Sequence, residues 1–255
     1  MAFQYLLAGC AYDPAEREFN KAERLFSQGL YKDAIDRYSY ITGKYAATPY
    51  GPKSQYRIGY IYHRHLKDSQ SAIYAYNSIF FLYPESPDAT AARLDLAGIY
   101  SEGGDHMAAI EEYQKLLKRE PESKQKYQYL IAMEYLMMND FRQARIELVE
   151  LSNIISNPNL IPDIRFQIAN IYYIEGNFTE AIKRYDEVVL KYPGHGAALE
   201  ALFGKAKALD ESGRYKEALV IYRELLNDYP NRKAVETRIG WIENRMKAKP
   251  FKGRH

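Results

Sequence analysis

The sequence has little cysteine, little tryptophan and no long hydrophobic run. Its 255 residues contain one cysteine, Cys10, and one tryptophan. A single cysteine excludes an intramolecular disulfide and a cysteine-rich metal site. No run of about 18 apolar residues occurs, and a helix that crosses a membrane needs one of about that length. The sequence therefore predicts a folded chain without a membrane-spanning helix.

An excess of charge of one sign is also missing. The chain has 35 basic and 33 acidic residues, and its formal net charge is +2. This near balance argues against the basic surface that nucleic-acid-binding proteins present. Motifs for catalysis and for phosphate, zinc or calcium binding do not occur either. We therefore expect no enzyme activity, no cofactor, no metal and no nucleic-acid partner.

What the sequence does contain is an internal repeat of about 37 residues. Six alanines recur at intervals of 38, 37, 35, 37 and 37 residues. A large side chain, tyrosine in all but one case, follows each alanine after four positions, and an aliphatic one follows after seven. These offsets place the three residues on one face of a helix. The aligned alanines are Ala34, Ala72, Ala109, Ala144, Ala181 and Ala218.

A second pattern precedes each of these helices. A small residue is followed three positions later by a large one, from Ala22/Leu25 in the first repeat to Ala206/Leu209 in the last. Two antiparallel helices approach closely only where one presents alanine or glycine, so the pattern predicts a helical hairpin. Glycines are expected to supply the left-handed turn of these hairpins. They are Gly29, Gly103, Gly176 and Gly213, and the prolines that close several repeats are Pro84, Pro121, Pro193 and Pro230.

These residues resemble the tetratricopeptide repeat. The resemblance implies an all-α, right-handed superhelical solenoid of six helical hairpins with a C-terminal capping helix. The second repeat carries one extra residue, which we place in its turn, and the fourth lacks the turn glycine. The expected segments are a signal-like stretch and linker at 1–13, repeats at about 14–47, 52–84, 88–121, 124–158, 161–193 and 197–230, a capping helix at 231–247 and a basic tail at 248–255.

The same resemblance implies a binding groove on the concave face, which the first helices of the repeats form. The family's lysine position for a ligand carboxylate holds aromatic residues or leucine here, so the groove is expected to bind an apolar or amphipathic segment of another protein. The alternative is that some of these side chains pack within the superhelix. The implied groove residues are Tyr56, Tyr60, Tyr129, Met133, Leu136, Met137, Phe166, Asn170, Tyr173 and Phe203, with His63, Leu94, Gly98, Lys207 and Asp210 at further positions.

Two histidines raise the question of a metal site. His63 and His65 lie two positions apart, so on a helix they point in different directions and could not readily share a metal ion. We expect them at a solvated helix end.

The segment Leu7-Ala8-Gly9-Cys10 resembles the lipobox of bacterial lipoproteins, whose cysteine is acylated. The cysteine follows an apolar stretch and precedes a short polar linker, although the usual basic region is absent. This resemblance implies lipidation of Cys10 and attachment to a membrane. The alternative is a frayed helix that carries a cysteine by chance.

Repeats of this length that end in Tyr-Pro, behind a lipobox, are similar to envelope lipoproteins of the BamD type, to pilotins and to CpoB. The resemblance implies a lipid-anchored scaffold on the periplasmic face of the bacterial outer membrane that assists assembly of an envelope complex. The alternative is a soluble cytoplasmic adaptor or co-chaperone without lipid.

Overall fold

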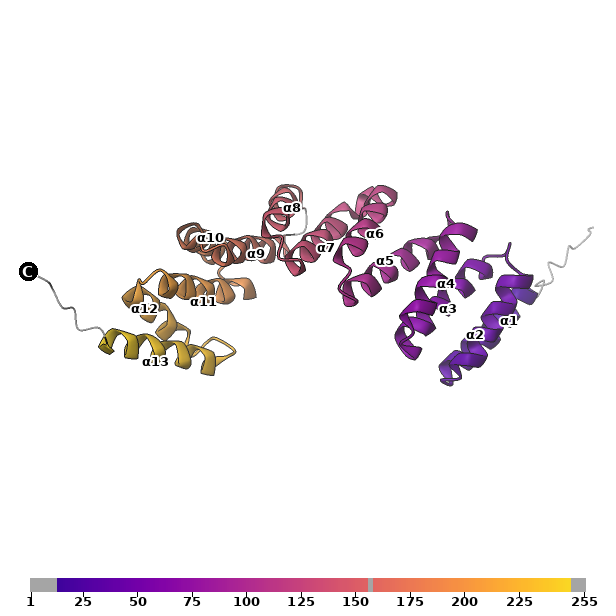
Figure 1. Cartoon of the computed structure of the whole chain (residues 1–255), viewed down its shortest axis with the longest axis horizontal. Helices are drawn as coiled ribbons and strands as arrows, with labels where there is room; N and C mark the ends of the chain where they lie inside the picture. Colours follow the sequence, from indigo (N-terminus) through magenta and orange to yellow (C-terminus); the bar gives the residue numbers. More distant parts are fainter. Residues whose placement is uncertain (1–12, 156–157, 249–255) are drawn as a thin grey trace, which may run out of the picture. The chain divides into compact units, whose positions relative to one another are not determined.

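A computed structural model describes residues 13–155 and 158–248, and every regular element within these ranges is a helix (Figure 1). The helices form two compact units, one up to Tyr127 and one from Gln128 onward, and each is described by itself. Cys10 lies outside the described residues.

The first unit contains three helix pairs. The first pair is α1 (Pro14–Ser27) with α2 (Tyr31–Lys44), the second α3 (Tyr50–Tyr60) with α4 (Ser69–Leu82), and the third α5 (Pro87–Glu102) with α6 (His106–Arg119). Helix α3 runs directly into a short π-helix, η1 (Ile61–Leu66), and a 3₁₀ turn, η2 (Pro121–Ser123), follows α6.

The second unit contains the remaining pairs and a closing helix. Helix α7 (Lys124–Met137), which begins just before the unit boundary, is followed by α8 (Phe141–Ile154). The next pairs are α9 (Ile161–Ile174) with α10 (Phe178–Lys191) and α11 (Gly196–Glu211) with α12 (Tyr215–Leu225), and α13 (Arg232–Ala248) packs on α12. The described chain confirms the predicted all-α class with six hairpins and a C-terminal helix.

The repeated alanine face forms the core of both units. All six aligned alanines are 0% exposed, and the residues four and seven positions after each of them are also buried. Tyr76 and Tyr185 belong to this face, and each ring fills space that a glycine leaves on a neighbouring helix. A Cβ at Gly59 would lie 2.5 Å from the Tyr76 ring, and one at Gly204 would lie 2.6 Å from the Tyr185 ring. The predicted close approach at small residues is therefore present.

The turn inside most hairpins combines a left-handed residue with a side-chain cap. The left-handed residue turns the chain so that backbone N–H groups can hydrogen-bond to the free carbonyl groups at the end of the first helix. The side chain of the Asp or Asn after it accepts a hydrogen bond from a backbone N–H near the start of the second helix. The pairs are Lys67-Asp68, Gly104-Asp105, Asn139-Asp140 and Gly176-Asn177.

One detail of these turns differs from the prediction. The left-handed glycine of the third repeat is Gly104, with φ 81°, whereas Gly103 has φ −80° and ends α5 in a helical conformation. In the fourth repeat, which lacks a turn glycine, Asn139 takes the left-handed position with φ 59°. Asparagine tolerates this region because its short polar side chain can hydrogen-bond locally.

The extra residue of the second repeat lies in a helix and not in the turn. The chain accommodates it by widening the last turns of the first helix into the π-helix η1. The prediction that His63 lies at a solvated helix end is therefore wrong, because His63 lies within η1 and is only 4% exposed. Its Nε2 atom lies 3.2 Å from Glu102 Oε2. His65 stacks on Tyr31, with ring centroids 4.4 Å apart.

We predict that Gly59→Ala destabilises the protein, because the new methyl group would overlap the Tyr76 ring. Overpacking of this kind costs about 1–3 kcal/mol, partly offset by the better helix propensity of alanine. Gly98→Ala is the matched control, since a Cβ there has no neighbour within 4 Å and should stabilise α5 by about 0.5–1 kcal/mol. Urea denaturation followed by circular dichroism measures both. Equal stability of the two variants would contradict this packing.

Candidate functional site

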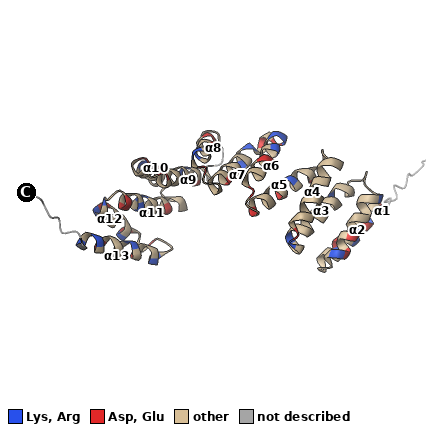
Figure 2. Cartoon of the chain, viewed as in Figure 1, with Lys and Arg blue, Asp and Glu red and all other residues tan. Residues whose placement is uncertain are grey.

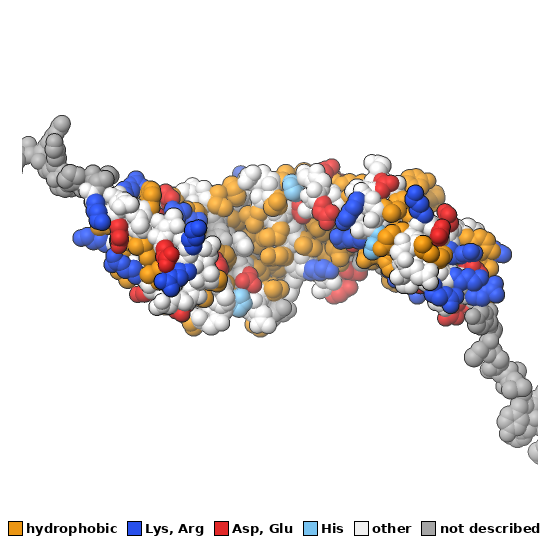
Figure 3. Space-filling model, turned by 90° about the horizontal axis from the view of Figure 1, so that it is seen from below, with side chains coloured by type: hydrophobic (Ala, Val, Ile, Leu, Met, Phe, Trp, Pro, Cys, Tyr) orange, Lys and Arg blue, Asp and Glu red, His pale blue; other side chains and the backbone are white. Residues whose placement is uncertain are grey.

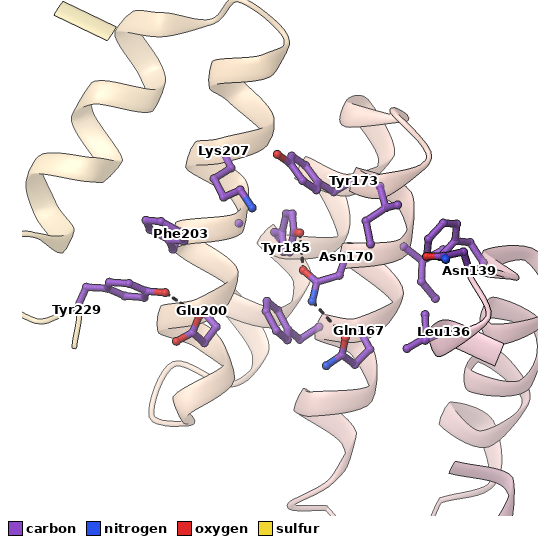
Figure 4. A pocket seen from close by; sticks show the side chains of 15 residues that line it. Leu136, Asn139, Gln167, Asn170, Tyr173, Tyr185, Glu200, Phe203, Lys207 and Tyr229 are labelled. Atoms are coloured by element: carbon purple, nitrogen blue, oxygen red, sulfur yellow. Dashed lines mark hydrogen bonds between the residues drawn. The ribbon is translucent and has the colours of Figure 1, made fainter. Parts of the chain in front are cut away.

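The second unit contains a groove of about 630 Å³, with first helices α9 and α11 providing most of its lining (Figure 4). We call it the aromatic groove. Five of the residues implied by the family resemblance line it together, and Lys207 lines it too. The five are Leu136, Phe166, Asn170, Tyr173 and Phe203.

Asn170 lies at the floor of the aromatic groove, where two hydrogen bonds fix its amide. The hydroxyl of Tyr185 donates to Asn170 Oδ1 at 2.7 Å, and Asn170 Nδ2 donates to Gln167 Oε1 at 3.3 Å (Figure 4). Burial raises the pKa of Tyr185, so its hydroxyl keeps the proton that it donates. Tyr185 also packs on Gly204, so one core residue supports the floor of the groove from below.

One wall of the groove is a stack of two rings. Phe203 and Tyr229 lie with ring centroids 4.6 Å apart and an interplanar angle of 11°. The Tyr229 hydroxyl donates to Glu200 Oε2 at 2.9 Å, which fixes the outer ring (Figure 4). The rings are therefore held in place before any ligand arrives, and a ligand need not order them.

The upper end of the groove in Figure 4 combines an aromatic ring with a cation. The Lys207 ammonium lies 4.6 Å from the centroid of the Tyr173 ring. Burial, and secondarily the charge of Arg238, lowers the pKa of Lys207. Burial raises the pKa of Tyr173, because in both residues it disfavours the charged form. A partly dehydrated cation beside apolar rings suits a ligand that carries an apolar side chain next to an anionic one.

Three further residues implied by the resemblance are not among those that line the aromatic groove. Tyr129 and Met133 are half-buried and pack against the core around Ala132 and Leu148. Met137 is 67% exposed at the end of α7.

Tyr56 and Tyr60 belong to the first unit, where Tyr56 takes part in a polar cluster. Tyr56 and Tyr76 both donate to Asp95 Oδ2, at 2.9 and 3.1 Å. Burial, followed by the Asp95 charge, raises the pKa of both tyrosines. Because the three residues come from α3, α4 and α5, Asp95 ties two adjacent hairpins together. Sequence analysis missed Asp95, since an acid between apolar positions carries no sign of its partners.

Clusters of at least three histidine, cysteine or acidic residues that could hold a metal ion are absent from the described parts of the chain. Within the same parts, every helix is too short or too polar to cross a membrane. Figure 3 shows hydrophobic side chains interspersed with charged ones on the visible face of each unit.

Comparison with known families identifies the repeat. Two family models, both described as tetratricopeptide repeat, match the chain, one at residues 53–86 and 91–123 and the other at residues 161–231. Together these matches cover just over half of the sequence. Among curated proteins, none matches the chain significantly.

Solved structures show the same architecture. A tetratricopeptide repeat protein from Parabacteroides merdae is 15% identical with a TM-score of 0.60, over 93% of this chain and 94% of that chain. The C-terminal part of a repeat protein from Cytophaga hutchinsonii is 16% identical with a TM-score of 0.62, over 89% and 95% of the two chains.

A third structure, YrrB, is described as a tetratricopeptide repeat protein with an unusual peptide-binding site. It is 14% identical with a TM-score of 0.51, over 72% of this chain and 89% of that chain. At these identities the likeness concerns the fold alone. The family matches, which together cover just over half of the sequence, show that this chain belongs to the tetratricopeptide-repeat family, and the six buried alanine faces agree with them.

Proposed function

We propose that the protein is a non-enzymatic scaffold that holds a segment of another protein in the aromatic groove of its second unit. The observation that carries this proposal is the groove itself, about 630 Å³ in volume and lined by rings that neighbouring side chains already hold in place. The fold supports it, because tetratricopeptide repeats are interaction modules and YrrB, which shares the fold, has a peptide-binding site.

The chemistry of the groove favours an apolar or amphipathic segment. Its rings offer apolar contact area, while Asn170 offers an amide whose orientation is set by Tyr185. Hot spots of interfaces are typically aromatic and surrounded by contacts that exclude water. Tyr173 and Phe203, on facing helices of the groove, are the residues that fit this description.

We also propose that Cys10 is lipidated and that the protein is a lipoprotein of the outer membrane that faces the periplasm and assists assembly of an envelope complex. Support comes from the sequence Leu7-Ala8-Gly9-Cys10, which resembles a lipobox. A soluble cytoplasmic adaptor is the alternative that the second experiment below distinguishes.

For the groove, we predict that Tyr173→Ala weakens binding of a peptide ligand about tenfold to a hundredfold. The reason is that a buried ring contributes roughly 1.5–3 kcal/mol. The measurement is fluorescence anisotropy with peptides selected from a random phage-displayed library on the wild-type protein. Leu190→Ala is the matched control, because Leu190 is 79% exposed on α10 and does not line the groove. Thermal melting checks that both variants fold. Unchanged affinity of a folded Tyr173→Ala variant would place the binding site elsewhere.

For the anchor, we predict that the protein expressed from its native start in a Gram-negative host sediments with membranes and incorporates labelled fatty acid. Cys10→Ser should release it to the soluble fraction, since the other residues of this segment offer no thiol to acylate. A single acyl chain holds a protein only marginally, whereas two or more hold it stably, so near-complete retention is expected. Identical soluble fractions for both forms would favour the cytoplasmic adaptor.

A further inference from the structure

A second cavity opens beside the aromatic groove, between α11 and the closing helix α13. Its volume is about 450 Å³. We call it the basic pocket, because three of its seven lining residues are cations and none is acidic. The lining residues are Lys207, Lys233, Arg238, Phe203, Asn231, Ala234 and Thr237. Figure 2 shows lysine and arginine residues in blue at both ends of α13, and those that line the pocket, Lys233 and Arg238, lie in the first two turns of the helix.

The two cavities are adjacent, because they share two lining residues. Phe203 and Lys207 line both of them, and they lie one turn apart on α11. Side chains four positions apart on a helix are separated by about 5–6 Å at Cβ. An apolar group on Phe203 and an anion on Lys207 would thus sit about this far from one another.

The two lysines of the pocket have no carboxylate partner within 4 Å among the described residues. Other cations of this region are neutralised locally, as in the pair of Arg232 with Glu236 at 2.8 Å. Lys207 instead contacts the Tyr173 ring, and Lys233 makes no ion pair with the described chain. The pocket therefore presents positive charge that the protein itself leaves available to a ligand.

The acid nearest to the pocket pairs with Arg238 and leaves the two lysines without an ion pair in the described chain. Asp210 Oδ2 lies 3.5 Å from Arg238 Nη1, but Asp210 is 1% exposed and its carboxylate accepts no hydrogen bond from the described chain. Burial raises the pKa of Asp210, and the charge of Arg238 opposes this shift. The charge of Glu211 raises the pKa of Lys207, but this effect is smaller than the lowering by burial and by Arg238. Because Arg238 repels Lys207, an anion placed between them would relieve that repulsion.

We propose that the basic pocket takes the carboxylate of an Asp or Glu side chain from the segment that occupies the aromatic groove. The proposal rests on the proposed scaffold function and names its ligand class: a peptide with an apolar side chain for the Phe203 wall and an acid for Lys207, Lys233 and Arg238. A span of about 6 Å corresponds to roughly two positions in an extended peptide, where each residue advances about 3.3 Å. In a helical peptide it corresponds to a spacing of three or four residues.

The experiment compares matched peptides on matched variants. A random phage-displayed library is selected on the wild-type protein, and the best binder is synthesised with its Asp and Glu residues and again with Asn and Gln in their place. We expect selected peptides to pair an apolar residue with an acid at one of these spacings. We expect the acidic form to bind at least about tenfold more tightly, since hydrogen bonds to charged groups are the stronger class.

Lys233→Glu tests the pocket directly, because Lys233 is exposed and forms no ion pair with the described chain that the substitution would break. It should weaken the acidic peptide by at least about tenfold and leave the neutral one unchanged. Lys216→Glu on α12 is the control of equal charge change and should alter neither. Added salt should weaken the acidic peptide more than the neutral one.

Two results separate failure of this inference from failure of the scaffold function. If both peptides bind equally, depend on Tyr173 and ignore Lys233→Glu, the groove binds peptides and the basic pocket takes no acid. If no selected peptide depends on Tyr173 or on Lys233, the scaffold function in this groove fails, and the inference fails with it.

Discussion

The structure depends on close packing between tyrosine rings and glycines of neighbouring helices. Tyr76 lies over Gly59, and Tyr185 lies over Gly204, at distances that leave no room for a methyl group. The contact sets how near neighbouring helices can approach, and the buried alanines of the same face allow the approach elsewhere. The two contacts differ in register, because Gly59 and Tyr76 lie in one hairpin whereas Gly204 lies in the hairpin that follows Tyr185. Rings at the same repeat position therefore pack both within a hairpin and between successive hairpins, as in solenoid repeats.

The candidate site depends on the same packing. Tyr185 fills the space above Gly204 and, through its hydroxyl, fixes the amide of Asn170 at the floor of the aromatic groove. A core residue therefore orients a ligand-facing one, so the groove is only as ordered as the helix packing beneath it. Phe203 and Tyr229 extend this order outward, since their stack is closed by the hydrogen bond from Tyr229 to Glu200. A preorganised wall of this kind lowers the entropic cost of binding.

The repeat tyrosines show how one position in the pattern serves different local chemistry. A buried hydroxyl without an acceptor is costly, yet the hydroxyl of Tyr222 has no hydrogen-bond partner among the described residues. Tyr38 donates to Glu23 and Tyr185 to Asn170, residues that hold equivalent positions fifteen residues earlier, whereas Tyr76 donates to Asp95 on the following hairpin. The aromatic ring is common to these repeats, and the polar partner is particular to each. The described core thus repeats in its apolar part and varies in its hydrogen bonds.

The sequence by itself determined the helical class, the hairpin pairing and the buried alanine face, because a period of 3.6 residues and the need for close helix approach act locally. Tertiary structure decided the features that depend on neighbours. The extra residue of the second repeat became a π-helix that buries His63, since the core positions on either side of it had to keep their register. It also decided which implied groove residues meet. Lys207 and Lys233, from α11 and α13, line one pocket because the closing helix folds back over the last hairpin, and no period in the sequence encodes which side chains converge there.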